Sequence, residues 1–435
     1  MKKIPNHIFV AGSSWIARFI SVTVQIFCIR YVIDAQGYNG YSVFALLSSL
    51  LAWAVLFDFG IGNALQNYVS EKRTSGEEYY SYILFSGKLV LILLLLILIF
   101  LLPLSSILSS WYLKSSDYLS VDEKWSLFSY SISIFAFSSV GSMVYKIWFA
   151  EQKGWQANIV IAISSLLGLL LVYLSSVTPE YNSLQVIIIA FYLPQAIISF
   201  ACLLYRLVDA AIELQKSRKV VSHFNIKPVL YRSSGFWGFT AIATVVLQAD
   251  AIVLSQKISS NEIALYYIMA KLFGLAGFIY SALLQAVWPV CTELRMKREW
   301  GKLNALVKVN ILVGSLFVLV SGIGIYIFKD YLLSMLSVKI ENNISPWLFL
   351  LFTVYFILRV WSDTYAMLLQ SMNVLRPLWY IVPFQALICL SMQWFLADYF
   401  GIYGIILGLI MSFLLTVCIY LPYVYKQKLK EISHV

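Results

Sequence analysis

Charged side chains are scarce in this sequence. Asp, Glu, Lys and Arg together make up only 12% of its 435 residues, whereas soluble domains carry about 25%. Hydrophobic residues reach 61%, so too few polar side chains remain to cover a surface in water. This composition excludes an ordinary soluble globular protein.

Histidine and cysteine are also sparse, and neither forms a metal-ligand pattern. The three histidines, His7, His223 and His434, lie in the termini or in a predicted loop. The five cysteines fall within or at the ends of apolar stretches, without a CxxC spacing: Cys28, Cys202, Cys291, Cys389 and Cys418. No imidazole is available within those stretches for metal binding or base catalysis. We therefore expect no metal site, no cofactor and no enzymatic activity.

Long apolar runs are what the sequence does contain. Residues 89–102 are almost uninterrupted hydrocarbon, and a membrane-spanning helix needs about 20 mostly apolar residues. Lipid offers no hydrogen bonds to bare backbone, so helices are expected, and the alternating polarity of a barrel is not found. The first apolar stretch, 8–33, is longer than the core of a signal peptide and is interpreted as the first span.

Twelve spans follow when the apolar runs are read against charged and Pro/Gly breaks. They lie near residues 8–33, 41–69, 80–103, 125–149, 155–176, 183–207, 231–255, 262–291, 303–327, 344–369, 378–397 and 402–421. A polar cytoplasmic connection, 207–230, divides the chain into two expected six-helix bundles, 1–215 and 216–435. The predicted fold class is an all-α polytopic membrane protein.

The basic residues indicate orientation. The net charge of +10 is spread over short loops, which is typical of membrane topology and not of a nucleic-acid partner. With both termini in the cytoplasm, Lys and Arg favour the cytoplasmic loops by about three to one.

The two predicted bundles share a weak internal repeat. Three residue pairs recur at almost the same spacing: Trp15 and Trp237, Gln25 and Gln248, and Glu71 and Glu293. With six spans, an even number, in the first bundle, the second bundle enters the membrane from the same side as the first. The pseudo-two-fold axis that relates the two halves would therefore lie along the membrane normal. Coincidence is the alternative explanation.

Ionisable residues within the predicted spans are the main functional signal. They are Arg18, Asp58, Asp250, Lys271, Arg359 and Asp363. Each costs about 2.5–3.5 kcal/mol on insertion scales, so we expect them to face a hydrated cavity or one another. Arg18 and Lys271 lie deepest and are the first candidates for substrate contacts; the alternative for Arg18 is binding to carbonyls of a broken helix.

The acidic residues leave more alternatives open. Asp58 stands beside two glycines that permit close helix approach or a local break, and it either carries a coupling proton or makes a helix–helix hydrogen bond. Asp250 lies near a span end, where solvation at the interface is the simpler role. Arg359 and Asp363 are four residues apart and can neutralise one another. Basic residues close to span ends are expected to act as interfacial anchors: Arg30, Lys146 and Lys308.

The Asp58 segment resembles the Wzx-type polysaccharide-repeat flippases of the multidrug/oligosaccharidyl-lipid/polysaccharide exporter superfamily. The matching positions are Asp58, Gly60, Gly62, Asn63, Ala64, Asn67 and Glu71. The segments 248–250 and 264–267 also resemble the family, and the likeness extends to length, span number and the two halves.

This resemblance implies a V-shaped pair of bundles of the multidrug-and-toxin-extrusion type, with spans 1, 2, 7 and 8 lining a cavity. It implies export of an undecaprenyl-diphosphate-linked oligosaccharide, an O-antigen or similar repeat unit, across a bacterial inner membrane. The implied partners are that glycan, membrane lipids and other polysaccharide assembly proteins, with a proton or sodium gradient in place of a cofactor. Candidate substrate-binding residues are Arg18, Gln25, Arg30, Asn63, Asn67, Gln248, Lys271 and Arg359. Candidate coupling or cavity acids are Asp58, Asp250 and Asp363.

Two other functions compete with this hypothesis. A drug antiporter of the same superfamily would bury more carboxylates than bases in order to hold cations. The charges within the predicted spans are instead slightly positive in sum and favour an anionic substrate. A neutral substrate is the alternative. A membrane polymerase or ligase would need a large outside loop, but the loops predicted near 104–124 and 328–343 are short.

Overall fold

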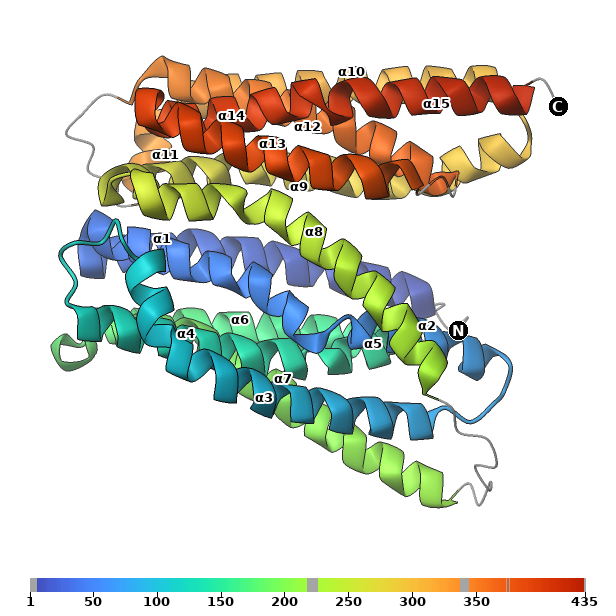
Figure 1. Cartoon of the computed structure of the whole chain (residues 1–435), viewed down its shortest axis with the longest axis horizontal. Helices are drawn as coiled ribbons and strands as arrows, with labels where there is room; N and C mark the ends of the chain where they lie inside the picture. The colour runs from blue at the N-terminus through green and yellow to red at the C-terminus, as the bar shows by residue number, and fades with distance from the viewer. Residues whose placement is uncertain (1–5, 217–225, 337–343, 373, 375, 434–435) are drawn as a thin grey trace. The chain divides into compact units, whose positions relative to one another are not determined.

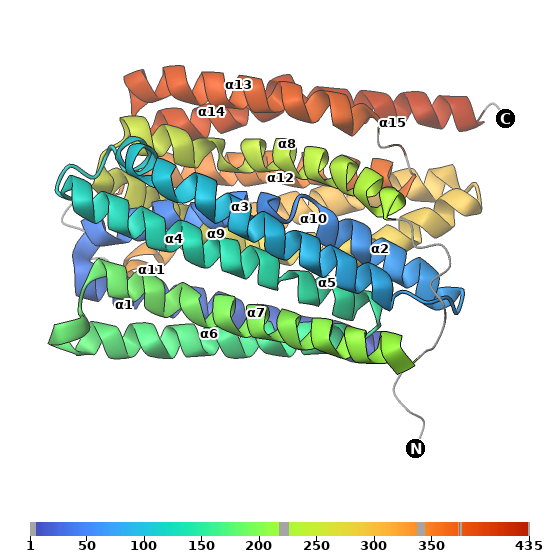
Figure 2. The ribbon, with the colours of Figure 1, turned by 60° about the horizontal axis from the view of Figure 1, so that its bottom comes forward.

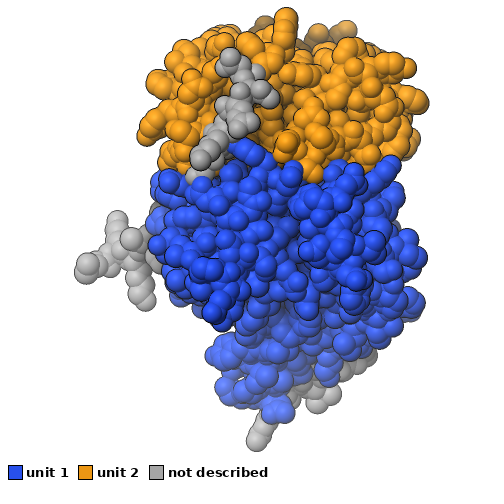
Figure 3. Space-filling view, turned by 90° about the vertical axis from the view of Figure 1, so that its left-hand side faces the viewer, with its two compact units in different colours: residues 1–241 blue, residues 242–435 orange. Residues whose placement is uncertain are grey.

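The computed structural model describes residues 6–216, 226–336, 344–372, 374 and 376–433, and these residues are helical with short connections and no strand. They form two compact units, residues 1–241 and 242–435, which are coloured separately in Figure 3. The division falls within helix α8 (Lys227–Lys257), whose first part belongs to unit 1 and whose remainder belongs to unit 2. The bundle boundary expected at 215/216 adjoins residues 217–225, which lie outside the described residues, and it stays a prediction.

Unit 1 is a helical bundle. Its elements are α1 (Asn6–Ala54), the 3-10 helix η1 (Val55–Asp58), α2 (Ile61–Thr74), α3 (Tyr80–Tyr112), α4 (Val121–Gly141), α5 (Met143–Ala150), α6 (Gly154–Val177), η2 (Pro179–Tyr181), α7 (Leu184–Lys216) and the first part of α8. Helix α6 packs against α1 and α7, and α4 packs against α7 (Figures 1 and 2). Helices α3 and α4 contact η1, and α3 and α5 contact α2, so these helices lie around the junction of α1, η1 and α2.

The described helices supply the twelve predicted crossings. Eleven segments are long and apolar enough to span a membrane, and the first, Gly12–Asp58, has 47 residues. A helix of that length would reach about 70 Å, more than twice the hydrocarbon thickness of about 30 Å. It is interrupted at Gly37, where φ is 67° and ψ is −171°, so its two parts are long enough for two crossings and, with the ten other segments, match the twelve predicted spans. The all-α polytopic fold is therefore confirmed.

Several helices run past the predicted span ends. Helix α7 continues to Lys216 and α8 begins at Lys227, so most of the predicted linker 207–230 is helical. Helix α3 reaches Tyr112, within the predicted outside loop 104–124, and α11 (Lys329–Met335) occupies part of the loop predicted at 328–343. The helix ends differ from the predicted span ends because hydropathy marks the edge of the hydrocarbon, whereas a helix can continue beyond that edge.

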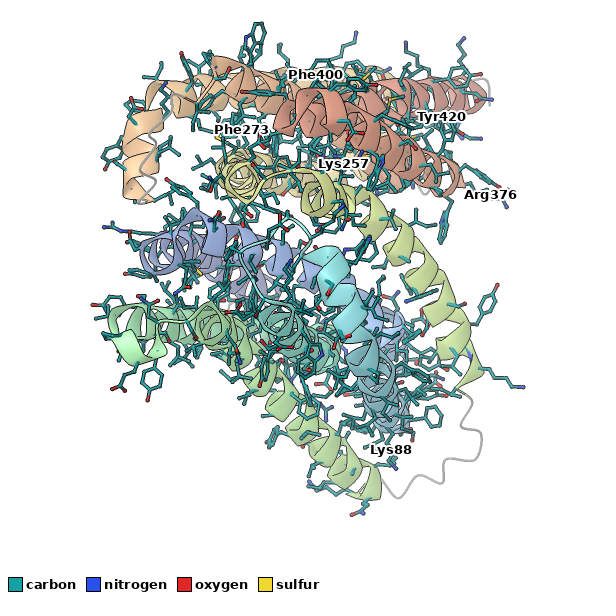
Figure 4. The ribbon with its side chains drawn as sticks, turned by 60° about the vertical axis from the view of Figure 1, so that its left-hand side comes forward. Lys88, Lys257, Phe273, Arg376, Phe400 and Tyr420 are labelled. Carbon is teal, nitrogen blue, oxygen red and sulfur yellow. The ribbon has the colours of Figure 1, made fainter. Side chains whose placement is uncertain are left out.

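Unit 2 contains the remainder of α8 and seven further helices: α9 (Ser260–Met296), α10 (Trp300–Ile327), α11, α12 (Pro346–Ser371), α13 (Arg376–Phe400), α14 (Ile402–Leu415) and α15 (Val417–Ser433). Helices α13 and α14 form a tight hairpin at Gly401, whose φ is 53°. Phe273, labelled in Figure 4, is fully buried and stacks on Phe352 and Phe356 of α12. This aromatic cluster ties α9 to α12.

Candidate functional site

The chain breaks its helical course at Asp58. Helix η1 ends there, and Phe59 and Gly60 take left-handed conformations with φ of 51° and 72° before α2 begins. The Asp58 carboxylate accepts hydrogen bonds from the backbone N–H groups of Gly60 at 2.8 Å and Gly62 at 3.1 Å. It therefore caps the start of α2, where the helix dipole also favours a negative charge. The local break that the two glycines permit is confirmed.

Both glycines are also points of close approach. A β-carbon on Gly60 would lie 2.6 Å from the carbonyl oxygen of Ser233 and 2.8 Å from the backbone nitrogen of Trp237, both on α8. A β-carbon on Gly62 would lie 2.7 Å from Oδ2 of Asp58 and 3.4 Å from Cγ of Lys146. Asp58 and Lys146 therefore lie over the same glycine.

Side-chain contacts join the first turns of α8 to the junction between η1 and α2. Trp237 stacks on Phe59 with ring centroids 5.7 Å apart, and its indole N–H donates to the carbonyl of Leu56 at 3.2 Å. Arg232 donates to both carboxylate oxygens of Glu71 at 2.8 and 2.9 Å. These contacts hold α8 against both ends of the η1–α2 segment.

The turn after α2 is held in a similar way. Lys72 pairs with Glu77 across this turn, and the hydrogen bond from Lys72 lowers the pKa of the Glu77 carboxyl, which also accepts from Ser75. The segment that carries Asp58 and Asn63 is thus fixed at both ends.

A cavity of about 250 Å³ opens beside Asp58, and we call it the Asp58 pocket. Its lining residues are Leu51, Val55, Leu56, Asp58, Gly60, Asn63, Ser138, Ser139, Ser142, Lys146, Gln195, Trp237 and Thr240. Five of these side chains make no hydrogen bond to any described residue: Asn63, Ser138, Ser139, Lys146 and Gln195. Ser138 and Ser139 are only 6% and 8% exposed, and buried polar groups are ordinarily hydrogen-bonded. The pocket is therefore suited to a polar ligand.

Unit 2 contains a second, smaller cavity of about 160 Å³, which we call the Arg359 pocket. Its lining residues are Val246, Leu247, Asp250, Tyr266, Ala270, Phe352, Tyr355, Phe356, Arg359, Leu409 and Phe413. The Tyr266 hydroxyl donates to Asp250 at 2.6 Å, and Arg359 donates to the Tyr355 hydroxyl at 3.3 Å. Arg359 also pairs with Asp363 at 3.2 Å, so the predicted mutual neutralisation is confirmed. Here each charged group already has a partner.

Related sequences decide the family. No protein-family model matches the chain. It is 43% identical over 99% of its length to a Salmonella typhi protein named as an O-antigen transporter, of which it covers 98%. It is 36% identical, again over 99% of its length, to a Yersinia pseudotuberculosis protein named as an O-antigen export protein, of which it covers 98%. The chain belongs to the family of O-antigen transporters.

Solved structures show the superfamily fold. An inward-facing multidrug resistance MATE family transporter matches with a TM-score of 0.70 and 13% identity, covering 95% of this chain and 96% of its own. The lipid II flippase MurJ, in an inward closed conformation, also matches with a TM-score of 0.70 and 14% identity. The match covers 96% of this chain and 87% of the MurJ chain. The expected multidrug-and-toxin-extrusion-like fold of this O-antigen transporter family member is confirmed.

The two pockets collect only some of the predicted site residues. Asp58 and Asn63 line the first pocket, and Asp250 and Arg359 line the second. The other candidates line neither pocket: Arg18 and Gln25 on α1, Arg30 beside Asp34 at 3.7 Å, exposed Asn67 on α2, Gln248 on α8 and exposed Lys271 on α9. A substrate role for these residues stays a prediction.

Lys146 and Gln195 are residues of the Asp58 pocket that sequence reasoning missed. Lys146, an expected interfacial anchor, lies on the short helix α5 and lines the pocket. Its signal was present in the sequence, because Ser138, Ser142 and Lys146 follow at intervals of four and form one polar stripe in an otherwise apolar segment. No comparable pattern marks Gln195 on α7.

Proposed function

We propose that this protein is a flippase that moves an undecaprenyl-diphosphate-linked oligosaccharide, the O-antigen repeat unit, from the cytoplasmic to the periplasmic leaflet of the bacterial inner membrane. Movement would occur by alternating access, in which two states of the protein bind the cargo with different affinities. Both termini would face the cytoplasm, in agreement with the distribution of Lys and Arg. The full-length identity to proteins named for O-antigen transport or export supports this function.

The observation that carries the proposal is the polar lining of the Asp58 pocket within an apolar helical bundle. A carboxylate, an ammonium group, two amides and several hydroxyls line one cavity. Such groups are costly in hydrocarbon unless they face water or a polar ligand. A transporter that carries a glycan head group past the lipid core needs a lining of this kind.

The pocket also bears on the rival drug-antiporter function. A cavity of about 250 Å³ is smaller than the sites of about 300–1,000 Å³ that enclose drug-sized ligands. One acid, Asp58, faces one base, Lys146, so the pocket has no excess negative charge to attract a cationic drug. The pocket suits one unit of a larger polar head group.

Asp58 is the residue through which a proton or sodium gradient would act in this proposal, because it is the only acid that lines the pocket. Replacing Asp58 with Asn removes the charge but keeps one side-chain oxygen as an acceptor for the cap of α2. The Asp58→Asn protein should therefore insert and fold while transport falls at least tenfold. The matched control is Asp117→Asn, which changes an exposed aspartate in the connection between α3 and α4.

Two measurements test the proposal. A strain that lacks its own O-antigen transporter and makes a compatible repeat unit receives each variant, and long-chain surface lipopolysaccharide is measured. Purified protein is then placed in liposomes that contain the lipid-linked glycan, and exposure of the glycan is followed with an impermeant glycosidase. We expect transport by the unaltered and Asp117→Asn proteins. Absence of translocation by the unaltered protein would reject the flippase, and full activity of Asp58→Asn would reject a role for the Asp58 charge.

A further inference from the structure

The side chains of the Asp58 pocket that make no hydrogen bond to any described residue come from four helices. Asn63 lies on α2, Ser138 and Ser139 on α4, Lys146 on α5 and Gln195 on α7. The stripe formed by Ser138, Ser142 and Lys146 continues across the junction of α4 and α5, so both helices present polar atoms to one cavity. A lipid-linked glycan offers this set of groups two polar parts, the diphosphate and the sugars.

The pocket is poorly suited to a diphosphate. Anion sites commonly use the free N–H groups at a helix N-terminus or a cluster of arginines. Here the N–H groups of Gly60 and Gly62 at the start of α2 are already occupied by the Asp58 carboxylate. Lys146 is the only cation in the lining, and the negative charge of Asp58 opposes it. A diphosphate would meet an unfavourable carboxylate and a single ammonium group.

The same groups match the hydroxyls of a sugar. Each sugar hydroxyl both donates and accepts a hydrogen bond. The amides of Asn63 and Gln195 and the serine hydroxyls also do both, Lys146 donates, and the Asp58 carboxylate accepts. Leu51, Val55 and Trp237 add apolar and aromatic surface for the C–H faces of a sugar ring. Trp237 is held in place by its stacking on Phe59.

We infer that the Asp58 pocket binds one uncharged sugar residue of the glycan head group, with Lys146 and Gln195 as specificity-determining contacts. This inference rests on the proposed flippase function and extends it, because it assigns the sugar and not the diphosphate to this pocket. The ammonium group of Lys146 donates charge-assisted hydrogen bonds to sugar oxygens while Asp58 balances its charge.

Binding to the purified protein tests the inference directly. The probes are the free oligosaccharide repeat, released from its lipid carrier, and inorganic diphosphate, each titrated by calorimetry into protein in nanodiscs. We expect binding of the oligosaccharide that diphosphate does not displace. Lys146→Met keeps most of the length of the side chain but removes its donors, and should weaken oligosaccharide binding about tenfold or more. Lys146→Arg should retain part of the affinity.

A matched control is available in the same unit. Lys88, labelled in Figure 4, is an exposed lysine on the membrane-spanning helix α3 and does not line the pocket. Lys88→Met should leave oligosaccharide binding unchanged. Gln195→Met provides a second pocket variant should Lys146→Met fail to fold, as judged by gel filtration and thermal unfolding. Normal binding by either folded pocket variant, or displacement of the oligosaccharide by diphosphate, would overturn the assignment.

Translocation in liposomes separates failure of this inference from failure of the proposed function. If the unaltered protein moves the lipid-linked glycan but the pocket variants keep the same half-saturating glycan concentration as Lys88→Met, the flippase stands and the sugar site is rejected. If the unaltered protein binds the free oligosaccharide, the pocket variants do not, and no lipid-linked glycan is moved, the sugar site stands and the flippase is rejected. The flippase function and the sugar site are both supported if the unaltered protein moves the lipid-linked glycan and only the pocket variants need a higher half-saturating glycan concentration.

Discussion

Replacing Gly60 with alanine should loosen the junction between α2 and α8. Gly60 has a φ of 72°, and its α-carbon faces backbone atoms of α8, so an added β-carbon would lie 2.6 Å from the Ser233 oxygen and 2.8 Å from the Trp237 nitrogen. A flexible side chain could rotate away, but these backbone atoms can yield only if α8 moves. Gly76 provides the control, because its φ is 70° and a β-carbon there would meet nothing within 4 Å.

The two substitutions share one effect and differ in another. Alanine in a left-handed conformation costs about 1–2 kcal/mol at either position. Overpacking adds about 1–3 kcal/mol, and only at Gly60. The difference between Gly60→Ala and Gly76→Ala therefore isolates the close contact with α8, and it corresponds to a difference in melting temperature of about 1–3 °C.

Thermal unfolding can be followed through the protein's own cysteines. Cys28 is 2% exposed and Cys291 is 1% exposed, so a thiol-reactive dye should label them only as the helices separate. We expect Gly60→Ala to melt below Gly76→Ala and Gly76→Ala to melt slightly below the unaltered protein. Equal melting temperatures for the two variants would refute the argument that backbone contact with α8 requires glycine at position 60.

Two further predictions concern ion pairs. Arg206 contacts Glu151 with both side chains almost fully buried, at 5% and 3% exposure, so Arg206→Ala should destabilise the protein by about 3–5 kcal/mol. Lys216→Ala breaks an exposed pair and should leave stability almost unchanged, so equal yields of folded protein from the two variants would contradict this prediction. Arg359→Leu and Asp363→Leu should each lower the melting temperature, because each leaves the other residue's charge without its partner. The double variant should recover most of the loss, and additive losses in melting temperature would contradict the pairing.

Hydropathy and glycine spacing predicted the fold and one wall of the site. Apolar runs located the helices because the membrane imposes one length scale and forbids unpaired backbone. Asp58 with its two glycines indicated a break because local hydrogen bonds and left-handed backbone are properties of a short segment. The opposite wall, with Lys146 and Gln195, could not be predicted in this way, since it depends on which helices pack together.

Depth in the membrane does not by itself decide which residues line the two described pockets. Arg18 and Lys271 lie far from the predicted span ends but line neither pocket, and their substrate role stays a prediction. Lys146 lies near a predicted span end, and it also faces Asp58 across Gly62. Helix packing and breaks such as the one at Ser142 decide which polar groups meet, and hydropathy carries little information about either.

The hydrogen-bond partners of each charge distinguish the two pockets. In the Arg359 pocket, Asp250 and Arg359 each form a hydrogen bond with a tyrosine, and Asp363 neutralises the guanidinium from one helical turn away. Each of these charged groups therefore has a partner within the protein. In the Asp58 pocket, the carboxylate caps a helix while Lys146 and four neighbouring polar side chains make no hydrogen bond to any described residue. Polar groups in an apolar bundle require hydrogen-bond partners. The Asp58 pocket, where several polar side chains lack such partners among the described residues, is therefore the one expected to bind cargo.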